Sequence, residues 1–336
     1  MADLSTNYLG LKLKNPLIAG ASNMMKDLDK VKAIEAAGAS AVVYKSLFEE
    51  QINQESAELE EDLQEFDHLH AEMITQHPNI EHAGPKEHLL NLEKVKKSVD
   101  IPVIASLNAI YKETWKEYAG FIQDTGVDAL ELNLYSVPRK FDQDGEDFVK
   151  KQLEAIQAVK SAVNIPVSVK LSPFYSNTLN VIRQMDEAGV KGFVLFNKFF
   201  EPEINIENEE HEFPFNLSVK GDYRLALRYA GLLFGNIKGN QCANSGIFDG
   251  EDVIKLILAG ADAVQVVSTL YKNKISQITK MLEEIEDWMK QKGYGSLDEF
   301  KGKLARKNSK DPFVYRRAQY VDILLNPQQV TRKYTV

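Results

Sequence analysis

Two lysines occupy equivalent places in this sequence, each at the end of a short apolar run. Lys45 ends the run VVYK, and Lys170 ends the run VSVK. An ammonium group that is buried without a partner is costly, so each lysine is expected to face an anion or an electron-rich ring. For either lysine alone, a strand side chain that extends its charge to water is the alternative. The pair therefore predicts a site that binds an anionic or electron-rich small molecule.

The stretch ALELNLYSVP, residues 129–138, adds amide and hydroxyl groups to this chemistry. Its leucines alternate with polar residues, a period of two that predicts a strand, and Pro138 is expected to end the regular pairing. Asn133 offers both a donor and an acceptor, and Ser136 offers a hydroxyl just past the strand. Such polar groups are costly to bury unless a ligand needs them, so the stretch predicts the floor and rim of an active site.

Small or polar residues, many of them amides and hydroxyls, stand at the end of each of eight predicted strands. The carboxyl ends of parallel strands converge on one mouth, where a ligand site is expected. Packing alone does not explain why polar groups would gather there. In chain order they are Ala21 and Ser22, Lys45 and Ser46, Asn108, Asn133 and Ser136, Lys170 and Ser172, Asn197 and Lys198, Asn244 with Ser245 and Gly246, and Ser268 and Thr269.

The run ANSGIFDGEDV after the seventh strand indicates a phosphate site. Ser245 and Gly246, before a helix that starts near Asp249, would present backbone N–H groups to a phosphate. Ser268 and Thr269 would complete the site, since the loops after strands seven and eight often bind phosphate in barrels. The alternative is an ordinary Ser-Gly turn before a helix.

Histidine and cysteine point to no metal centre. Five of the six histidines lie between His68 and His88, at a spacing that fits no compact helical pair, so no metal is predicted. Cys242 is the one cysteine, which excludes an intrachain disulfide, and it is interpreted as a small core residue.

Strand-like and helix-like segments alternate along the chain. Three helix-to-strand joints, AAGASAVV, DTGVDALEL and LAGADAVQVV, place glycine at the helix end before an apolar strand. The expected strands are 15–21, 41–46, 102–107, 129–138, 166–172, 192–197, 237–243 and 263–267. The expected helices are 28–37, 85–99, 114–124, 146–163, 178–188, 225–234, 249–258 and 275–290. Eight such units predict an α/β fold, a closed (β/α)₈ TIM barrel, rather than an open doubly wound sheet, for which no reversal of strand order is marked.

The barrel is expected to span residues 1–295 as one domain, followed by a C-terminal appendage, 296–336. Insertions after strand two (48–84) and strand six (198–221) are acidic and lie on the side of the active site, either as lids or as solvated decoration.

Composition and net charge limit the classes of partner that are expected. The chain has 336 residues, 44% hydrophobic content and a net charge of −9, which argues against nucleic acid or an anionic membrane as a partner. We find no secretory signal at the start and no apolar run as long as a membrane span. A soluble cytoplasmic protein is predicted.

Taken together, these segments resemble the dihydroorotate dehydrogenases, FMN-dependent (β/α)₈ enzymes of pyrimidine biosynthesis, and more closely their soluble first class. The matching segments are NPLIAGAS, AVVYKS, ELNLYS, VSVKLSP, FVLFN, ANSGI and AGADAVQVVSTL. The resemblance implies an oxidoreductase that converts dihydroorotate to orotate, in which a base removes a carbon-bound proton while a hydride passes to flavin N5. It also implies a homodimer, and it leaves the electron acceptor unknown.

The resemblance also implies roles for single residues. Ala21, Ser22 and Ser46 would contact the flavin, and Lys45 would touch both flavin and substrate. Asn108 and Asn133 would bind flavin or substrate, and Asn197 would hold the substrate. Lys170 would lie by the pyrimidine end of the isoalloxazine. Ser245, Gly246, Ser268 and Thr269 would hold the FMN phosphate.

Ser136 stands where the family places its catalytic base, a cysteine in the soluble class and a serine in the membrane-associated class. A serine needs a water relay or a dry, polarised pocket to act as a base. The chain departs from the soluble class where Val137 follows Ser136 in place of proline, and where Lys198 follows Asn197 in place of serine or threonine.

Three other functions stay open from the sequence. One is an FMN oxidoreductase that acts on another cyclic amide. A second is a Schiff-base lyase that uses Lys170. A third is a barrel that binds FMN but has lost catalysis.

Overall fold

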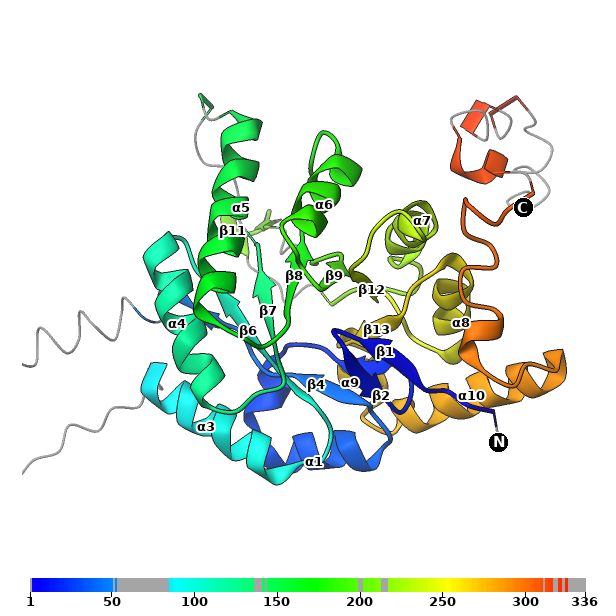
Figure 1. Ribbon diagram of the computed structural model, residues 1–336, viewed down its shortest axis with the longest axis horizontal. Helices are drawn as coiled ribbons and strands as arrows, with labels where there is room; N and C mark the ends of the chain where they lie inside the picture. The colour runs from blue at the N-terminus through cyan, green and yellow to red at the C-terminus, as the bar shows by residue number, and fades with distance from the viewer. Residues whose placement is uncertain are drawn as a thin grey trace, which may run out of the picture.

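Parallel strands that follow one another around a ring form the centre of the molecule (Figure 1). The computed structural model describes residues 2–50, 52, 85–135, 141–142, 144–198, 202–212, 217–310, 312–316, 320–321 and 324–325. In this part of the chain the ring is built from β3 (Leu17–Ala19), β4 (Ala41–Val43), β6 (Val103–Asn108), β7 (Ala129–Asn133), β8 (Val167–Leu171), β9 (Gly192–Leu195), β12 (Asn240–Asn244) and β13 (Ala263–Val266). Each strand pairs in parallel with its neighbours, and β4 pairs with β6 to close the ring. The predicted (β/α)₈ barrel is confirmed.

Helices cover the outside of the ring (Figure 1). They are α1 (Leu28–Ala36), α3 (Pro85–Ser98), α4 (Lys112–Asp124), α5 (Gly145–Ala162), α6 (Thr178–Glu187), α7 (Arg224–Leu233), α8 (Gly250–Ala259) and α10 (Gln277–Lys292). A side-chain cap marks the start of α1, where the Asp27 carboxylate accepts from the N–H groups of Asp29 and Lys30. Their bounds lie within a few residues of those that the sequence predicts.

Several short elements were not predicted. They are the antiparallel hairpin of β1 (Thr6–Tyr8) and β2 (Leu11–Leu13), the 3₁₀ turn η1 (Asn23–Lys26), strand β5 (Leu47–Phe48) beside β6, and helix α9 (Ser268–Asn273). The insertion after strand six holds a second hairpin, β10 (Glu203–Asn205) with β11 (Glu210–Glu212). Strand β12 starts at Asn240, three residues later than expected.

The β1–β2 hairpin closes the N-terminal end of the barrel. Tyr8, Leu9 and Leu13 are buried in a core cluster with inward residues of the strands, among them Cys242. The Leu9 N–H donates to Asn240 Oδ1 at 3.0 Å. With this end filled by side chains, the C-terminal ends of the strands are left as the end open to a ligand.

The segment after α10 packs back on the helices. Leu297 and Phe300 are buried, and the Gly302 and Leu304 N–H groups donate to the last carbonyls of α8, those of Ile257 and Leu258, at 2.8 Å each. The division at residue 295 stays a prediction. Most of the insertion 48–84 lies outside the described residues, and the lid role of both insertions stays a prediction.

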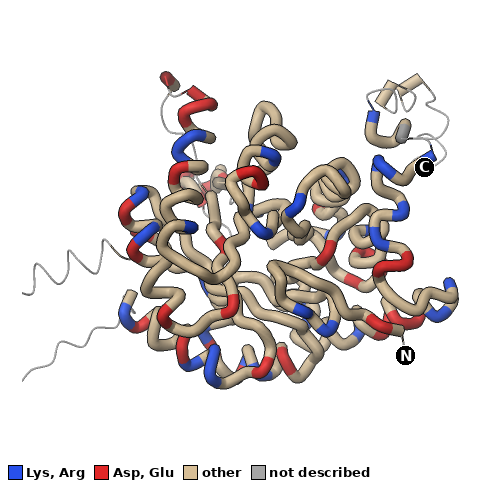
Figure 2. Tube along the Cα trace, viewed as in Figure 1, with Lys and Arg blue, Asp and Glu red and all other residues tan. Residues whose placement is uncertain are grey.

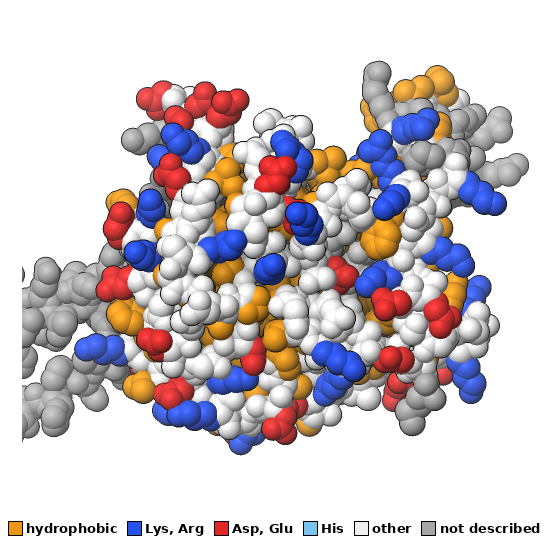
Figure 3. Space-filling view, in the orientation of Figure 1, with side chains coloured by type: hydrophobic (Ala, Val, Ile, Leu, Met, Phe, Trp, Pro, Cys, Tyr) orange, Lys and Arg blue, Asp and Glu red, His pale blue; other side chains and the backbone are white. Residues whose placement is uncertain are grey.

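The surface carries both charges. Lys and Arg alternate with Asp and Glu along the outer helices (Figure 2), and the face seen in Figure 3 shows the two signs interspersed. Within the described ranges, no helix combines the length and the hydropathy that a membrane crossing requires.

Candidate active site

A cavity of about 280 Å³ lies at the C-terminal ends of the barrel strands. The following predicted residues line it: Ala21, Ser22, Lys45, Ser46, Asn133, Lys170, Asn197, Ser245, Gly246 and Ser268. Asn108 and Thr269 are buried outside its lining, and Ser136 lies outside the described residues. Most of the polar strand ends that the sequence singled out therefore meet around one mouth.

Three amides organise one side of the cavity. Asn197 Nδ2 donates to Asn133 Oδ1 at 2.7 Å. Asn108 Nδ2 donates to the carbonyls of Asn133, at 2.6 Å, and Tyr135, at 3.1 Å. Asn108 thus holds the end of β7 and the first residues after it, while Asn133 and Asn197 face the cavity itself.

The cavity is positively charged. Lys45, Lys170 and Lys198 line it, and none of the described lining residues is Asp or Glu. The Lys170 side chain is buried, and no described residue forms an ion pair or a hydrogen bond with its ammonium. Burial lowers the pKa of Lys45, and the nearby ammonium of Lys26 lowers it further. Lysines crowded around one mouth favour an anionic ligand.

In the sequence, Lys198 stands out as a polar strand end and as a departure from the soluble class at that position. It lines both this cavity and a smaller one of about 190 Å³ beside it. Its Nζ lies 3.7 Å from Asp222 Oδ2, and its side chain is 38% exposed. A half-exposed pair at that distance holds the lysine weakly, so its charge remains available to a ligand.

The turn after β12 forms the opposite side. Ser245 and Gly246 both have a left-handed backbone, with φ of +73° and +70°. A Cβ on Gly246 would lie 2.7 Å from the Asp222 N and from the Val219 O, so this position requires glycine. The Gly246 N–H donates to Ser218 Oγ at 3.0 Å.

Ser218 joins this turn to the next strand end. Its hydroxyl lies 2.7 Å from Ser268 Oγ, and its N–H donates to the same oxygen at 3.0 Å. Ser268 is the first residue of α9, not the end of a strand as the sequence suggested. The three segments that carry Ser218, Gly246 and Ser268 are therefore bonded into one polar wall.

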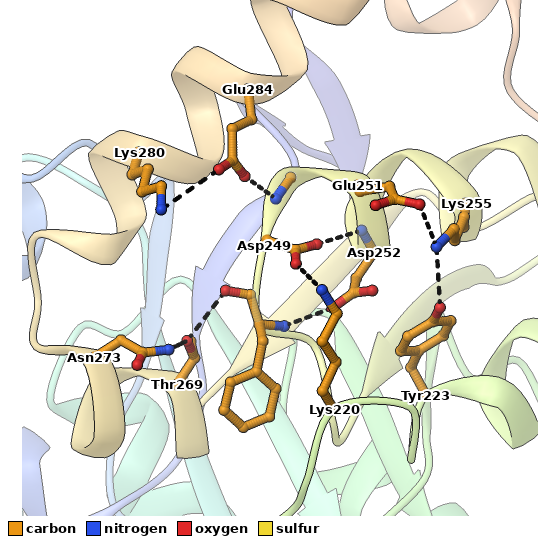
Figure 4. A network of polar contacts seen from close by, with 12 residues as sticks. Lys220, Tyr223, Asp249, Glu251, Asp252, Lys255, Thr269, Asn273, Lys280 and Glu284 are labelled. Atoms are coloured by element: carbon orange, nitrogen blue, oxygen red, sulfur yellow. Dashed lines mark hydrogen bonds and ion pairs between the residues drawn. The ribbon is translucent and has the colours of Figure 1, made fainter. Parts of the chain in front are cut away.

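A polar network around the start of α8 supports this wall (Figure 4). Asp249 caps α8 by accepting from the Asp252 N–H at 3.0 Å, and it is ion-paired with Lys220. Asp252 Oδ2 accepts from the Phe248 N–H at 2.9 Å. Thr269 Oγ1 donates to the Phe248 carbonyl at 3.3 Å, so Thr269 supports the turn from behind.

Gln265 forms part of the cavity floor and was not predicted. It lies on β13, lines the cavity, and is almost fully buried. Its Nε2 lies 2.5 Å from Glu131 Oε2, and its Oε1 has no partner among the described residues. The signal was present in the sequence, since a lone glutamine interrupts the apolar run AVQVV.

The neighbourhood of Lys45 includes a buried histidine. The His88 ring of α3 packs edge-on against Tyr44, with ring centroids 5.1 Å apart. Burial, together with the nearby charges of Lys45 and Lys26, lowers the pKa of His88 to about 4. Within the described ranges, no group of His, Cys, Asp and Glu is arranged to hold a metal ion.

Known proteins are similar to this chain over most of its length. The family model "Dihydroorotate dehydrogenase" matches residues 3–289. The chain is 27% identical over 307 residues to the "Dihydroorotate dehydrogenase B (NAD(+)), catalytic subunit" of Methanocaldococcus jannaschii, covering 89% of this chain and 97% of that protein. A protein of the same name from Methanosarcina mazei is 29% identical over 304 residues, covering 87% of this chain and 92% of that protein.

Proposed function

This chain belongs to the dihydroorotate dehydrogenase family, and from that premise we propose that it oxidises dihydroorotate to orotate with FMN as its cofactor. The observation that carries the proposal is the buried ammonium of Lys170, which has no ion-pair or hydrogen-bond partner among the described residues and lies beside the Asn133–Asn197 amide pair. An anionic cyclic amide offers carboxylate, carbonyl and N–H groups, which match cations and amides of this kind.

The donor set fits FMN. The second polar atom of the Gln265 amide is buried and has no partner in the part of the chain that the structure describes, which suits the polar edge of a flavin ring. Ser245, Gly246 and Ser268 form a wall of hydroxyl and backbone groups, which suits a phosphate. We assign Ala21, Ser22, Lys45 and Ser46 to the remaining contacts with the cofactor.

Asn108 has a positioning part in this proposal. Its amide donates to two backbone carbonyls at the end of β7, so it is well placed to orient the chain that leads into Ser136. Its direct contact with flavin or substrate, and that of Thr269 with the phosphate, remain predictions.

Dihydroorotate loses two hydrogens from adjacent carbons in this reaction. FMN, when bound, supplies the acceptor for the hydride and its electron pair. Ser136 is proposed to take the proton from the other carbon. Lys45, Asn133 and Asn197 are proposed to hold the substrate, and Lys170 places a positive charge where negative charge accumulates.

The test is an anaerobic titration of the purified protein with L-dihydroorotate, followed in the visible flavin band. Bleaching is expected. A yellow protein that stays yellow would contradict dihydroorotate as the substrate. A protein that takes up no flavin, and in which borohydride traps a substrate adduct on Lys170, would replace the proposal with a Schiff-base lyase.

The electron acceptor and the assembly are also proposals. The relatives from Methanocaldococcus and Methanosarcina are named catalytic subunits of an NAD(+) enzyme, which supports a search for an electron-transfer partner. The resemblance supports a cytoplasmic homodimer, which sedimentation at several concentrations would test.

A further inference from the structure

A carboxyl group lies in the barrel beneath the cavity. Glu131 faces inward from β7, and in the strand registers it lies opposite Ser106 of β6 and Ser168 of β8. Two residues along the same strand, Asn133 pairs with Lys170. The Glu131 side chain is fully buried.

The contacts of this carboxyl are incomplete if it is ionised. Its Oε2 lies 2.5 Å from the Gln265 amide, whereas Glu131 Oε1 and Gln265 Oε1 have no partner among the described residues. Two orphaned acceptors in a dry core are costly. A separation of 2.5 Å is also too short for a usual N–H···O bond, whereas it falls at the short end of the range for an O–H donor.

A proton on Glu131 accounts for the short distance and leaves Glu131 Oε1 as a neutral carbonyl oxygen in place of an unpartnered carboxylate oxygen. The oxygen and nitrogen of an amide are exchanged by a half-turn that leaves its shape unchanged. With the Gln265 amide turned, the protonated carboxyl donates its O–H to the amide oxygen at 2.5 Å. The amide nitrogen then replaces the orphaned oxygen and offers N–H to the cavity that Gln265 lines.

The surroundings of Glu131 favour the neutral acid. Burial raises the pKa of Glu131, while the ammonium of Lys170 opposes that shift. Tyr8 and Cys242 face it from the N-terminal end of the barrel, and burial raises the pKa values of both. Asp262, farther along, adds negative potential there. Lys170 is therefore the single described cation that acts on Glu131.

We propose that Glu131 is a neutral acid in the working protein and acts as a positioning residue, fixing the Gln265 amide and leaving the Lys170 charge directed to the cavity. An ionised Glu131, in the barrel beneath the cavity, would instead offset the positive charge of Lys170. The part that concerns Lys170 and the flavin rests on the proposed function, whereas the protonation of Glu131 does not.

Infrared difference spectra of the protein without added cofactor test whether Glu131 is protonated. The carbonyl stretch of a protonated carboxylic acid is expected at neutral pH and should disappear in Glu131→Gln. Asp252 is the matched control, because its carboxyl is also buried and burial raises its pKa. The band assigned to Glu131 should persist in Asp252→Asn, which keeps the test usable if Glu131→Gln does not fold.

The flavin midpoint potential tests whether the Lys170 charge is left uncompensated by Glu131. Glu131→Gln keeps a neutral side chain and should leave the potential unchanged, whereas Lys170→Met should lower it. Absence of the carboxylic acid band, its persistence in Glu131→Gln, or a higher potential in Glu131→Gln would overturn the proposal. Failure to bind flavin would count against the proposed function and leave the infrared result standing.

Discussion

Asn197 and Asn133 meet side chain to side chain although they are 64 residues apart, with Nδ2 of Asn197 donating to Oδ1 of Asn133 at 2.7 Å. The two lie at the ends of β9 and β7, so their bond passes across β8, the strand that carries Lys170. One contact therefore joins the chain after β9 to the end of β7, the strands on either side of Lys170.

Asn197→Ala should weaken substrate binding more than it weakens the fold. It removes one polar contact and leaves Asn133 Oδ1 unpaired, at a cost of about 1–3 kcal/mol. We expect KM for dihydroorotate to rise about tenfold, with FMN retained. Asn205→Ala, in the exposed β10–β11 hairpin, is the control, and an equal change in KM there would refute the assignment.

Lys198→Met should reduce the affinity for an anionic ligand. The side chain lines the cavity and is only weakly held by Asp222, so its charge should attract the orotate carboxylate. We expect the Kd for orotate, read from the flavin spectrum, to rise and its salt dependence to weaken. Lys191→Met, an exposed lysine just before β9 at the other end of the barrel, should change neither.

Gly246→Ala should destabilise the protein and its cofactor site together. The left-handed backbone costs an alanine about 1–3 kcal/mol, and the added Cβ would clash with the backbone at Asp222 and Val219. Thermal unfolding and FMN titration measure the two effects. Gly120→Ala, within α4 and in open space, should instead stabilise by up to about 1 kcal/mol. A harmless Gly246→Ala would show that the turn is not constrained.

His88 should make stability fall as the pH drops from about 6.5 to about 4. The unfolded histidine takes up a proton below about 6.5, whereas the folded pKa is about 4. The unfolded state thus binds more protons in this window, at a cost of up to about 3 kcal/mol. Urea unfolding across this range should show a shallower slope for His88→Phe. His211→Gln, on exposed β11, should keep the wild-type slope.

Ser136→Ala should abolish dihydroorotate-dependent bleaching of the flavin while FMN binding stays intact, because the proposed base would be gone. The measurement is the rate of flavin bleaching in a single turnover under anaerobic conditions. Ser98→Ala, in α3 on the outside of the barrel, is the control. Unchanged bleaching in Ser136→Ala would assign the base elsewhere.

The barrel was predictable because its strands are apolar, its joints repeat, and its helices have clear periodicity. The β1–β2 hairpin and α9 escaped prediction because strands of three residues and a helix of six are too short for a period to stand out. The site followed from polar residues at strand ends, as with Asn133 and Lys170. The Glu131–Gln265 contact did not, because 134 residues separate the partners and only barrel closure brings them together.

The hairpin that fills the N-terminal end of the barrel has a consequence for synthesis on the ribosome. Thr6 bonds to the Asp262 carbonyl, a partner 256 residues later in the chain. At roughly 5–20 residues per second, that partner is translated on the order of ten seconds to a minute after the hairpin. The cluster that buries Tyr8, Leu9 and Leu13 also contains Cys242 and Ala263, so it is complete only after β12 and β13 have emerged. Residues 6–13 precede every strand of the barrel in the chain, yet the last of those strands, β13, completes their packing.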